Sequence, residues 1–234
     1  MGIVGGGGQA EFIAVHERVA MPVPAALDWA QAGAFPEIYC TAYDALFTQA
    51  QLQSGERVLI NGGAGGVGTA AIQLAHLAGA FPVATVRNEK MAAHVARLGA
   101  VPVVAEAGSD AAAASGPFDV VLELVGAVNL NQSLRSLAHR GRICFIGVGA
   151  GPKCEFNALH LMAKRGRIHG STLRSSPLEE KALLARELER HVLPHVDAGR
   201  LTVPVDRTFP LDEVHDAYEH FAAGGKFGKI SLLI

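Results

Sequence analysis

Net charge, cysteine and long apolar runs are all scarce in this sequence. The 234 residues carry a formal net charge of -2, so the electrostatic signature of a nucleic-acid-binding protein is missing. No apolar run is long enough to span a bilayer, and the N-terminus lacks the basic and apolar segments of a secretory signal. The three cysteines, Cys40, Cys144 and Cys154, match no zinc-ligand spacing. These absences predict a cytoplasmic protein with reduced thiols, and neither nucleic acid nor a membrane as partner.

An obvious catalytic side chain is also missing. The ten histidines form no ligand cluster, and Pro194 disturbs the helical face that would bring His191 and His195 together. Tyr39 and Tyr43 offer hydroxyl groups, but a tyrosine packed in a core is the commoner case. The sequence therefore leaves the catalytic residues unassigned.

What the sequence does contain is a glycine-rich turn between a strand and a helix. Residues 58–60 form a short apolar run, and residues 69–78 carry alanine and leucine at helical spacing. Between them a G-x-G-x-x-G pattern is formed by Gly63, Ala64, Gly65, Gly66, Val67 and Gly68. In this context the pattern predicts a dinucleotide site, because glycines let the backbone approach a pyrophosphate and the helix N-terminus holds its charge. The alternative is a glycine-rich turn that binds nothing.

Strands and helices alternate through the middle of the chain. Apolar runs predict five more strands, at residues 83–86, 101–104, 119–125, 142–148 and 167–173. Helical patterns lie between them, at residues 89–98, 130–137 and 159–164. This order predicts an α/β fold with a doubly wound parallel sheet, the Rossmann arrangement.

The two ends of the chain follow different patterns. We expect a strand at residues 10–15, and two helices, at residues 29–35 and 41–50, interrupted by Pro36. The last third predicts helices at residues 178–198, which Pro194 kinks or ends early, and 211–223, with strands at residues 201–205 and 230–234. The sparser strands indicate that the chain enters a second domain.

Further short stretches carry a family resemblance as a set. They are residues 32–35, 39–43, 52–56, 97–100, 118–123, 140–143, 170–174 and 228–230. With the glycine-rich turn they resemble the zinc-independent quinone oxidoreductases of the medium-chain dehydrogenase/reductase superfamily, the zeta-crystallin-like group. Proteins of this family begin with a GroES-like half-barrel, and this chain lacks most of it.

The resemblance implies a division of the chain into three parts. Residues 1–35 would be a remnant of the GroES-like catalytic domain, and residues 36–173 the dinucleotide-binding domain. Residues 174–234 would return to the catalytic domain.

The resemblance also implies an activity and a set of cofactor contacts. The activity is hydride transfer from NADPH to a quinone or an α,β-unsaturated carbonyl compound, without a metal ion. Besides the glycine-rich turn, the implied contacts are Thr41, Asn129, Ile146, Gly147, Val148, Ser171, Thr172, Leu173 and Lys226. Lys229 lies in the same C-terminal segment. From the residues alone, Thr41 and Asn129 are equally suited to helix caps, and Lys226 to a solvated surface.

The end of the second predicted strand bears on the choice between NADPH and NADH. An NAD-binding unit usually places a carboxylate there, to accept hydrogen bonds from the ribose 2′-hydroxyl. Residues 85–88 contain none, and Glu89 falls in the following helix. Arg87 can hold a 2′-phosphate with its planar guanidinium and Lys90 can add charge, so we expect NADPH. The alternative for Arg87 is a solvated arginine at a strand end.

Two alternative functions and a homodimer are also expected from the sequence. Residues 85–87 faintly resemble the same segment of enoyl-thioester reductases. A catalytically weak NADPH-binding protein is the other alternative, because most of the half-barrel is lacking. We expect a homodimer, because residues 167–173 would form an open sheet edge that relatives pair across a two-fold axis.

Overall fold

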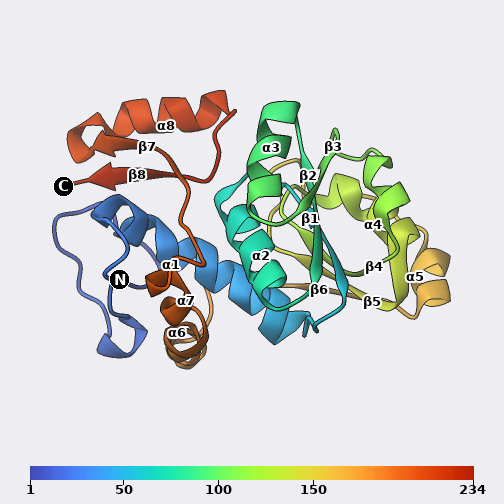
Figure 1. The fold of residues 1–234 in the computed structure, drawn as a ribbon, viewed down its shortest axis with the longest axis horizontal. Coiled ribbons are helices and arrows are strands. Elements are labelled where there is room, and N and C mark those ends of the chain that lie inside the picture. Colours follow the sequence, from blue (N-terminus) through green and yellow to red (C-terminus); the bar gives the residue numbers. More distant parts are fainter. The chain divides into compact units, whose positions relative to one another are not determined.

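In the computed structural model, which describes residues 1–234, the middle of the chain and its two ends belong to different units (Figure 1). Unit 2 comprises Ala42–Ala64 and Ala71–Ser171. Unit 1 comprises Met1–Thr41, Gly65–Ala70 and Thr172–Ile234. The division at residues 35 and 173 that the family resemblance implies stays a prediction.

Unit 2 is built on a six-stranded sheet with the order β3-β2-β1-β4-β5-β6. Every neighbouring pair of strands is parallel. The strands are β1 (Arg57–Asn61), β2 (Phe81–Val86), β3 (Val101–Val104), β4 (Phe118–Glu123), β5 (Leu137–Phe145) and β6 (Arg167–Gly170). The chain first adds strands on one side of β1 and then on the other, so β1 and β4 flank the switch point of a doubly wound sheet. The predicted fold class is confirmed.

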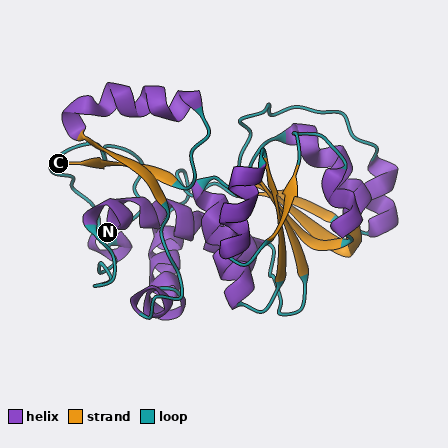
Figure 2. Ribbon diagram, turned by 45° about the horizontal axis from the view of Figure 1, so that its top comes forward, coloured by secondary structure: helices purple, strands orange, loops and turns teal.

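Helices cover both faces of this sheet (Figures 1 and 2). One face carries α2 (Gly66–Leu77) and α3 (Glu89–Arg97), and the other carries α4 (Leu130–Ser136) and α5 (Ala158–Lys164). Short helical turns η3 (Ala111–Ser115) and η4 (Ala127–Asn129) lie in the connections. The central strands β1, β2 and β4, covered on both faces, bury nearly every side chain, which explains their continuous apolar runs. Phe118, Leu134 and Leu137 are fully buried in this core.

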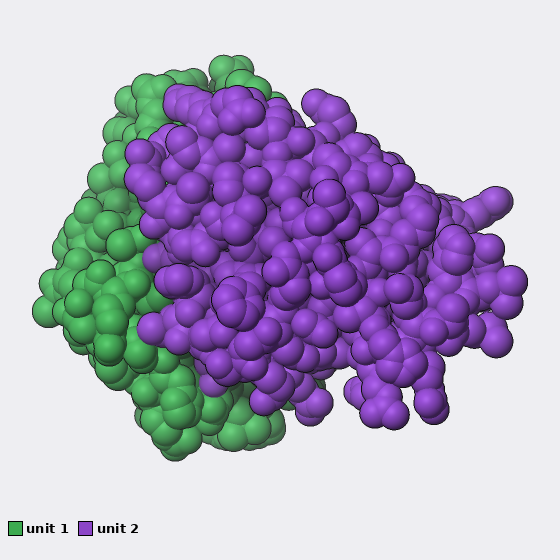
Figure 3. All heavy atoms as spheres, turned by 45° about the vertical axis from the view of Figure 1, so that its right-hand side comes forward, with its two compact units in different colours: residues 1–41, 65–70, 172–234 green, residues 42–64, 71–171 purple.

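Unit 1 contains the ends of the chain and is coloured separately in Figure 3. Its two strands, β7 (Val205–Pro210) and β8 (Lys229–Leu233), pair in parallel, and α8 (Val214–Ala223) packs along them. Its other elements are η1 (Glu17–Val19), α1 (Trp29–Tyr43), α6 (Leu178–His191), α7 (Leu193–Asp197) and η5 (Leu211–Glu213). None of the protein's helices has the length and apolar character needed to cross a bilayer.

Two predictions about α1 and its surroundings are wrong. Residues 10–15 form no strand, because alternation alone does not make one where no neighbouring strand is available to pair. Pro36 lies inside α1 and does not interrupt it. Phe35 and Tyr39 are fully buried, their rings stack 4.5 Å apart, and the Tyr39 hydroxyl donates to the Thr202 carbonyl at 2.8 Å. This packing outweighs the hydrogen bond that a proline removes from a helix.

Two boundaries in the C-terminal third also differ from expectation. The strand predicted at residues 201–205 lies at Val205–Pro210 instead. The single helix predicted at residues 178–198 is two helices, α6 and α7, which meet at Val192. Pro194 occupies the first turn of α7, where its missing N–H is tolerated, so the early end of α6 agrees with the prediction.

Candidate functional site

Most of the predicted cofactor residues in unit 2 follow the carboxyl ends of strands. They are Gly63 and Ala64 after β1, Arg87 after β2, Asn129 after β4, Ile146 to Val148 after β5, and Ser171 after β6. Because all six strands are parallel, these positions share one edge of the sheet. Ligands of open α/β sheets bind at this edge, next to the switch point.

The first glycines of the turn serve the packing of β1 against β2. Gly62 has a φ of +88°, which favours glycine, and its N–H donates to Thr85 Oγ1 at 3.1 Å. The N–H of Gly63 donates to the Thr85 carbonyl at 2.9 Å. A Cβ on Gly63 would lie 2.7 Å from Ala84 Cβ. These two amides are therefore engaged by β2, and the amides suited to a phosphate lie farther along the turn.

Those amides belong to the first turn of α2. The first hydrogen bond of the helix runs from the Thr69 N–H to the Gly65 carbonyl at 2.9 Å. The N–H groups of Gly66, Val67 and Gly68 thus have no acceptor within the helix, as in the first turn of any helix. They lie at the positive end of the helix dipole, so this turn suits an anion.

Position 66 also requires glycine for steric reasons within unit 1. A Cβ there would lie 2.5 Å from Lys229 Cδ and 2.8 Å from Ile38 Cγ2. The Lys229 ammonium is held by the Glu37 carboxylate at 2.9 Å. The backbones of Gly65 and Gly228 form a parallel bridge beside it. The chain around residues 228–229 thus packs directly against the predicted pyrophosphate loop.

A buried carboxylate that the sequence reading missed lies at the end of β4. Glu123 is 0% exposed, and its Oε1 accepts from the N–H groups of Val125 at 2.7 Å and Gly126 at 2.9 Å. The Nδ2 of Asn129 donates to the same oxygen at 3.1 Å, and the Nδ2 of Asn61 donates to Oε2 at 2.7 Å. Burial raises the pKa of Glu123 above its ordinary value, and the four donors limit the rise because each favours the ionised form. A polar residue directly after an apolar strand was the available signal, since Asn61 ends β1 in the same way.

Asn129, predicted to contact the cofactor, has both ends of its amide engaged inside the protein. Besides the bond to Glu123, its Oδ1 accepts from the Gly108 N–H at 2.6 Å. Its side chain makes no capping bond to α4, so the alternative interpretation as a helix cap is wrong. A direct contact between Asn129 and a cofactor stays a prediction.

The end of β2 presents cations without a competing carboxylate. Arg87 and Lys90 are exposed, and neither has a hydrogen-bond or ion-pair partner among residues 1–234. Asn88 caps α3 by accepting from the Met91 N–H at 3.0 Å, and Glu89 is the first residue of that helix. Both cations are therefore available to a negatively charged group.

The connections after β5 and β6 are fixed by short contacts. The N–H groups of Ile146 and Gly147 donate to the Glu123 carbonyl at 2.9 and 3.1 Å. A Cβ on Gly147 would overlap the Leu124 carbonyl oxygen, so this position has no room for a side chain. The Ser171 hydroxyl donates to the buried Asp44 carboxylate. Val148 is exposed beyond them.

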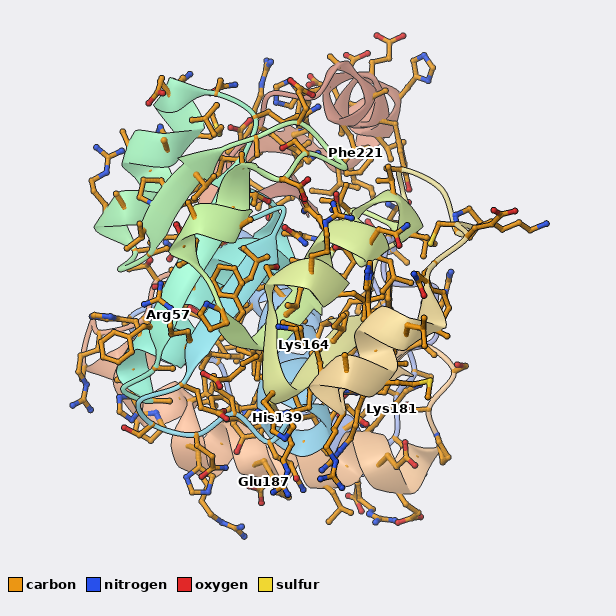
Figure 4. All side chains as sticks on the ribbon, turned by 90° about the vertical axis from the view of Figure 1, so that its right-hand side faces the viewer. Arg57, His139, Lys164, Lys181, Glu187 and Phe221 are labelled. Carbon is orange, nitrogen blue, oxygen red and sulfur yellow. The ribbon has the colours of Figure 1, made fainter.

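The remaining predicted contacts lie in unit 1. Thr41 lies near the end of α1 and not at its start, so the interpretation of Thr41 as a helix cap is wrong. Leu173 is buried, whereas Thr172 is exposed. The Lys226 ammonium lies 3.8 Å from the ring centre of Phe221, which is labelled in Figure 4.

Two features of the side chains bear on metal binding and on thiol chemistry. Among residues 1–234, no three or more His, Cys, Asp or Glu residues come together in a group that could hold a metal ion. Burial, followed by the charge of Asp44, raises the pKa of the Cys144 thiol to about 12, which leaves it protonated and unreactive.

Comparison with known proteins gives the family. A family model described as zinc-binding dehydrogenase matches residues 66–189. The quinone oxidoreductase of Pongo abelii is 33% identical over 244 residues, which cover 97% of this chain and 70% of that protein.

Solved structures agree with the sequence comparison. The quinone oxidoreductase of Thermus thermophilus, solved alone and with NADPH, has a TM-score of 0.88 and 33% identity over 100% of this chain and 76% of its own. The crotonyl-CoA carboxylase/reductase AntE in complex with NADP has a TM-score of 0.80 and 27% identity over 94% of this chain. The chain spans only 60% of the length of that enzyme. The chain belongs to the zinc-binding dehydrogenase family, as a quinone-oxidoreductase-like member of the medium-chain dehydrogenase/reductase superfamily.

Proposed function

We propose that this chain is an NADPH-dependent oxidoreductase that delivers a hydride to a quinone or an α,β-unsaturated carbonyl compound without a metal ion. The observations that carry the proposal are two features that directly follow β1 and β2 along the chain. The first turn of α2 has N–H groups without an acceptor within the helix, and the tip of β2 carries two unpaired cations and no carboxylate.

Each group of residues has a distinct part in this proposal. Gly66, Val67 and Gly68 would hold the pyrophosphate through backbone N–H groups, and Arg87 with Lys90 would hold the ribose 2′-phosphate. Within unit 2, the segments after β5 and β6 would border the nicotinamide. For Thr41, Thr172, Leu173 and Lys226 of unit 1, a cofactor contact stays what the family resemblance implies. When bound, the nicotinamide supplies the hydride, and the protein orients the ring and excludes water.

Replacing Arg87 tests the cofactor preference. A charge-assisted bond to a phosphate contributes roughly 1.5–3 kcal/mol, which is about a 10- to 100-fold preference for NADPH over NADH. We expect Arg87→Ala to remove most of this preference while leaving NADH affinity nearly unchanged, in calorimetric titrations of both cofactors. Lys164→Ala is the control, because it removes a cation from the end of α5 (Figure 4). Equal losses for both cofactors would show that Arg87 does not contact the phosphate.

A second candidate function is reduction of an enoyl thioester. The likeness to a crotonyl-CoA carboxylase/reductase favours it. NADPH oxidation with a quinone, an enone and a crotonyl thioester as acceptors separates the two functions. NADPH binding with no turnover on any acceptor would favour the third possibility, a cofactor-binding protein without useful catalysis.

A homodimer formed through β6 is also part of the proposal. That strand lies at the edge of the sheet, where its outer backbone groups have no neighbouring strand among residues 1–234.

A further inference from the structure

The strongest feature that the proposed function leaves unexplained is the charge of Glu123. A fully buried carboxylate is costly unless it is well paired, and a glutamine of the same shape would carry no charge. No cation contacts the carboxylate, which is surrounded instead by four N–H donors. A proton on either oxygen would point toward an N–H group. The donor set as placed fits an ionised side chain that acts only as an acceptor.

One branch of hydrogen bonds runs from Glu123 to the glycine-rich turn. Glu123 Oε2 accepts from Asn61 Nδ2, and Asn61 Oδ1 accepts from the Thr85 hydroxyl at 3.2 Å. Thr85 Oγ1 in turn accepts from the Gly62 N–H. Each group has one orientation that fits, so the ionised carboxylate sets the direction of every bond in the branch.

A second branch fixes the connections after the other strands. Through Oε1, Glu123 holds the N–H groups of Val125 and Gly126 and the amide of Asn129. Asn129 reaches the connection after β3 at Gly108. The backbone carbonyl of Glu123 adds the connection after β5, by accepting from Ile146 and Gly147. One residue thus joins the connections after β3, β4 and β5 to the start of the turn after β1.

We infer that Glu123 is a positioning residue for the cofactor: its buried carboxylate aligns the connections at the carboxyl edge of the sheet, which form the proposed dinucleotide site. The inference rests on the proposed function. Glu123 is fully buried, so it acts through the groups that it holds and does not touch the cofactor itself.

Exchanging the amide and the carboxylate tests this arrangement. In Glu123→Gln, the new side-chain NH2 group faces the Asn61 Nδ2 donor. Asn61 then has no acceptor at position 123, so the branch through Asn61 and Thr85 is broken. Leaving a buried donor unpaired costs enough to predict about 10- to 100-fold weaker NADPH binding by calorimetry. Adding Asn61→Asp restores each bond, because the carboxylate then at position 61 accepts from both the new amide at position 123 and the Thr85 hydroxyl. We expect the double variant to bind NADPH within about threefold of the unmodified protein.

Glu56→Gln is the matched control, because it removes a carboxylate that precedes β1 at the opposite edge of the same sheet. We expect it to lower the melting temperature without changing NADPH affinity. Titrations are made well below each melting temperature, with circular dichroism as the measure of folding. Thr85→Val breaks the same branch while leaving Glu123 in place, and we expect it to weaken NADPH binding as well. It replaces Glu123→Gln as the test if that variant does not fold.

The outcomes separate the inference from the proposed function. If the unmodified chain binds neither NADPH nor NADH, the proposed function fails. If it binds NADPH, and Glu123→Gln or Thr85→Val binds equally tightly, Glu123 does not position the site. A double variant that stays as weak as Glu123→Gln also overturns the inference, because a restored network would then have no effect.

Discussion

Position 66 has little room for a side chain and lies in the turn that we propose binds the pyrophosphate. Ile38 is fully buried and cannot retreat from an added Cβ, and Lys229 is held at its far end by Glu37. We therefore expect Gly66→Ala to strain the first turn of α2, although alanine is normally the better helix former. The predicted loss is about 1–3 kcal/mol of stability, with weaker NADPH binding. Denaturant unfolding and calorimetry measure the two effects.

Gly33 provides the matched control for this steric argument. It lies in the interior of α1, is exposed, and has nothing within 4 Å of the position its Cβ would take. Alanine there should raise stability by about 0.5–1 kcal/mol, because it removes backbone freedom from the unfolded chain. If both substitutions shift stability in the same direction, crowding at position 66 is not the reason for its glycine.

At the scale of elements, Arg142 ties β5 to the segment that leads into β1. Its Nε donates to the Ala50 carbonyl at 2.8 Å, and its Nη2 to the Gln51 carbonyl at 3.0 Å. Both guanidinium ends also reach the Glu56 carboxylate, at 2.7 and 2.8 Å. The side chains of Arg142 and Glu56 are 14% and 22% exposed. Such a part-buried, two-pronged pair stabilises more than an ion pair at the surface.

The Arg142–Glu56 pair predicts a pH-dependent contribution to stability. Burial opposes ionisation of Glu56, but the hydrogen bonds from Arg142 and the Gln53 N–H, with the charge of Arg142, lower its pKa below 4.5. A folded-state pKa below the unfolded value means that the stabilisation exists above the unfolded value and is lost as pH falls through the folded one. Glu56→Gln should cost about 1–3 kcal/mol near neutral pH and much less in acid. Urea unfolding of the unmodified chain and of Glu56→Gln, near neutral pH and in acid, measures this. An equal difference in unfolding free energy at both pH values would contradict the prediction.

The elements of unit 2 could be predicted because their signals are local. Six apolar runs, separated by helical patterns and glycine stops, gave the six strands within a few residues of their bounds. The predictions for Pro36 and for residues 10–15 were wrong because both depend on contacts with other parts of the chain. Whether Pro36 ends the helix depends on the packing of Phe35 and Tyr39 in α1. A strand at residues 10–15 would need a neighbouring strand, which the alternation of residues does not reveal.

The candidate site was predictable in its backbone and not in its polar interior. The G-x-G-x-x-G pattern located the turn, and the lack of a carboxylate after β2 is the basis for predicting Arg87 as a phosphate contact. Glu123 lay inside a predicted strand without attracting notice. Its donor Asn61 is 62 residues earlier in the chain, so only the parallel pairing of β1 with β4 brings the two together. The sequence also did not reveal that Asn129 is already bonded at both ends, to Gly108 and to Glu123.

At the scale of the whole molecule, the free edge of β6 is the feature that bears on assembly. The N–H of Ser171 donates to the Phe145 carbonyl at 3.0 Å, toward β5. Because backbone groups alternate in direction along a strand, the N–H groups of Ile168 and Gly170 face away from the sheet. The preceding helix α5 has no buried residue, and its Leu159 and Met162 are 66% and 68% exposed. The open backbone groups of β6, together with these exposed apolar side chains of α5, favour association with a second copy of this chain.

Gly170→Pro tests this interface while sparing the sheet. Proline removes only the outward N–H of residue 170, and a Cβ there meets nothing closer than 3.8 Å, so the pairing of β6 with β5 should persist. We expect the unmodified chain to be a dimer by light scattering and Gly170→Pro to be a monomer with an unchanged circular dichroism spectrum. Gly170→Ala keeps the N–H and should remain a dimer. Proline at 171 is less suitable, since it would break the inward bond to Phe145. A monomeric unmodified chain, or a Gly170→Pro variant that still dimerises, would exclude pairing through β6.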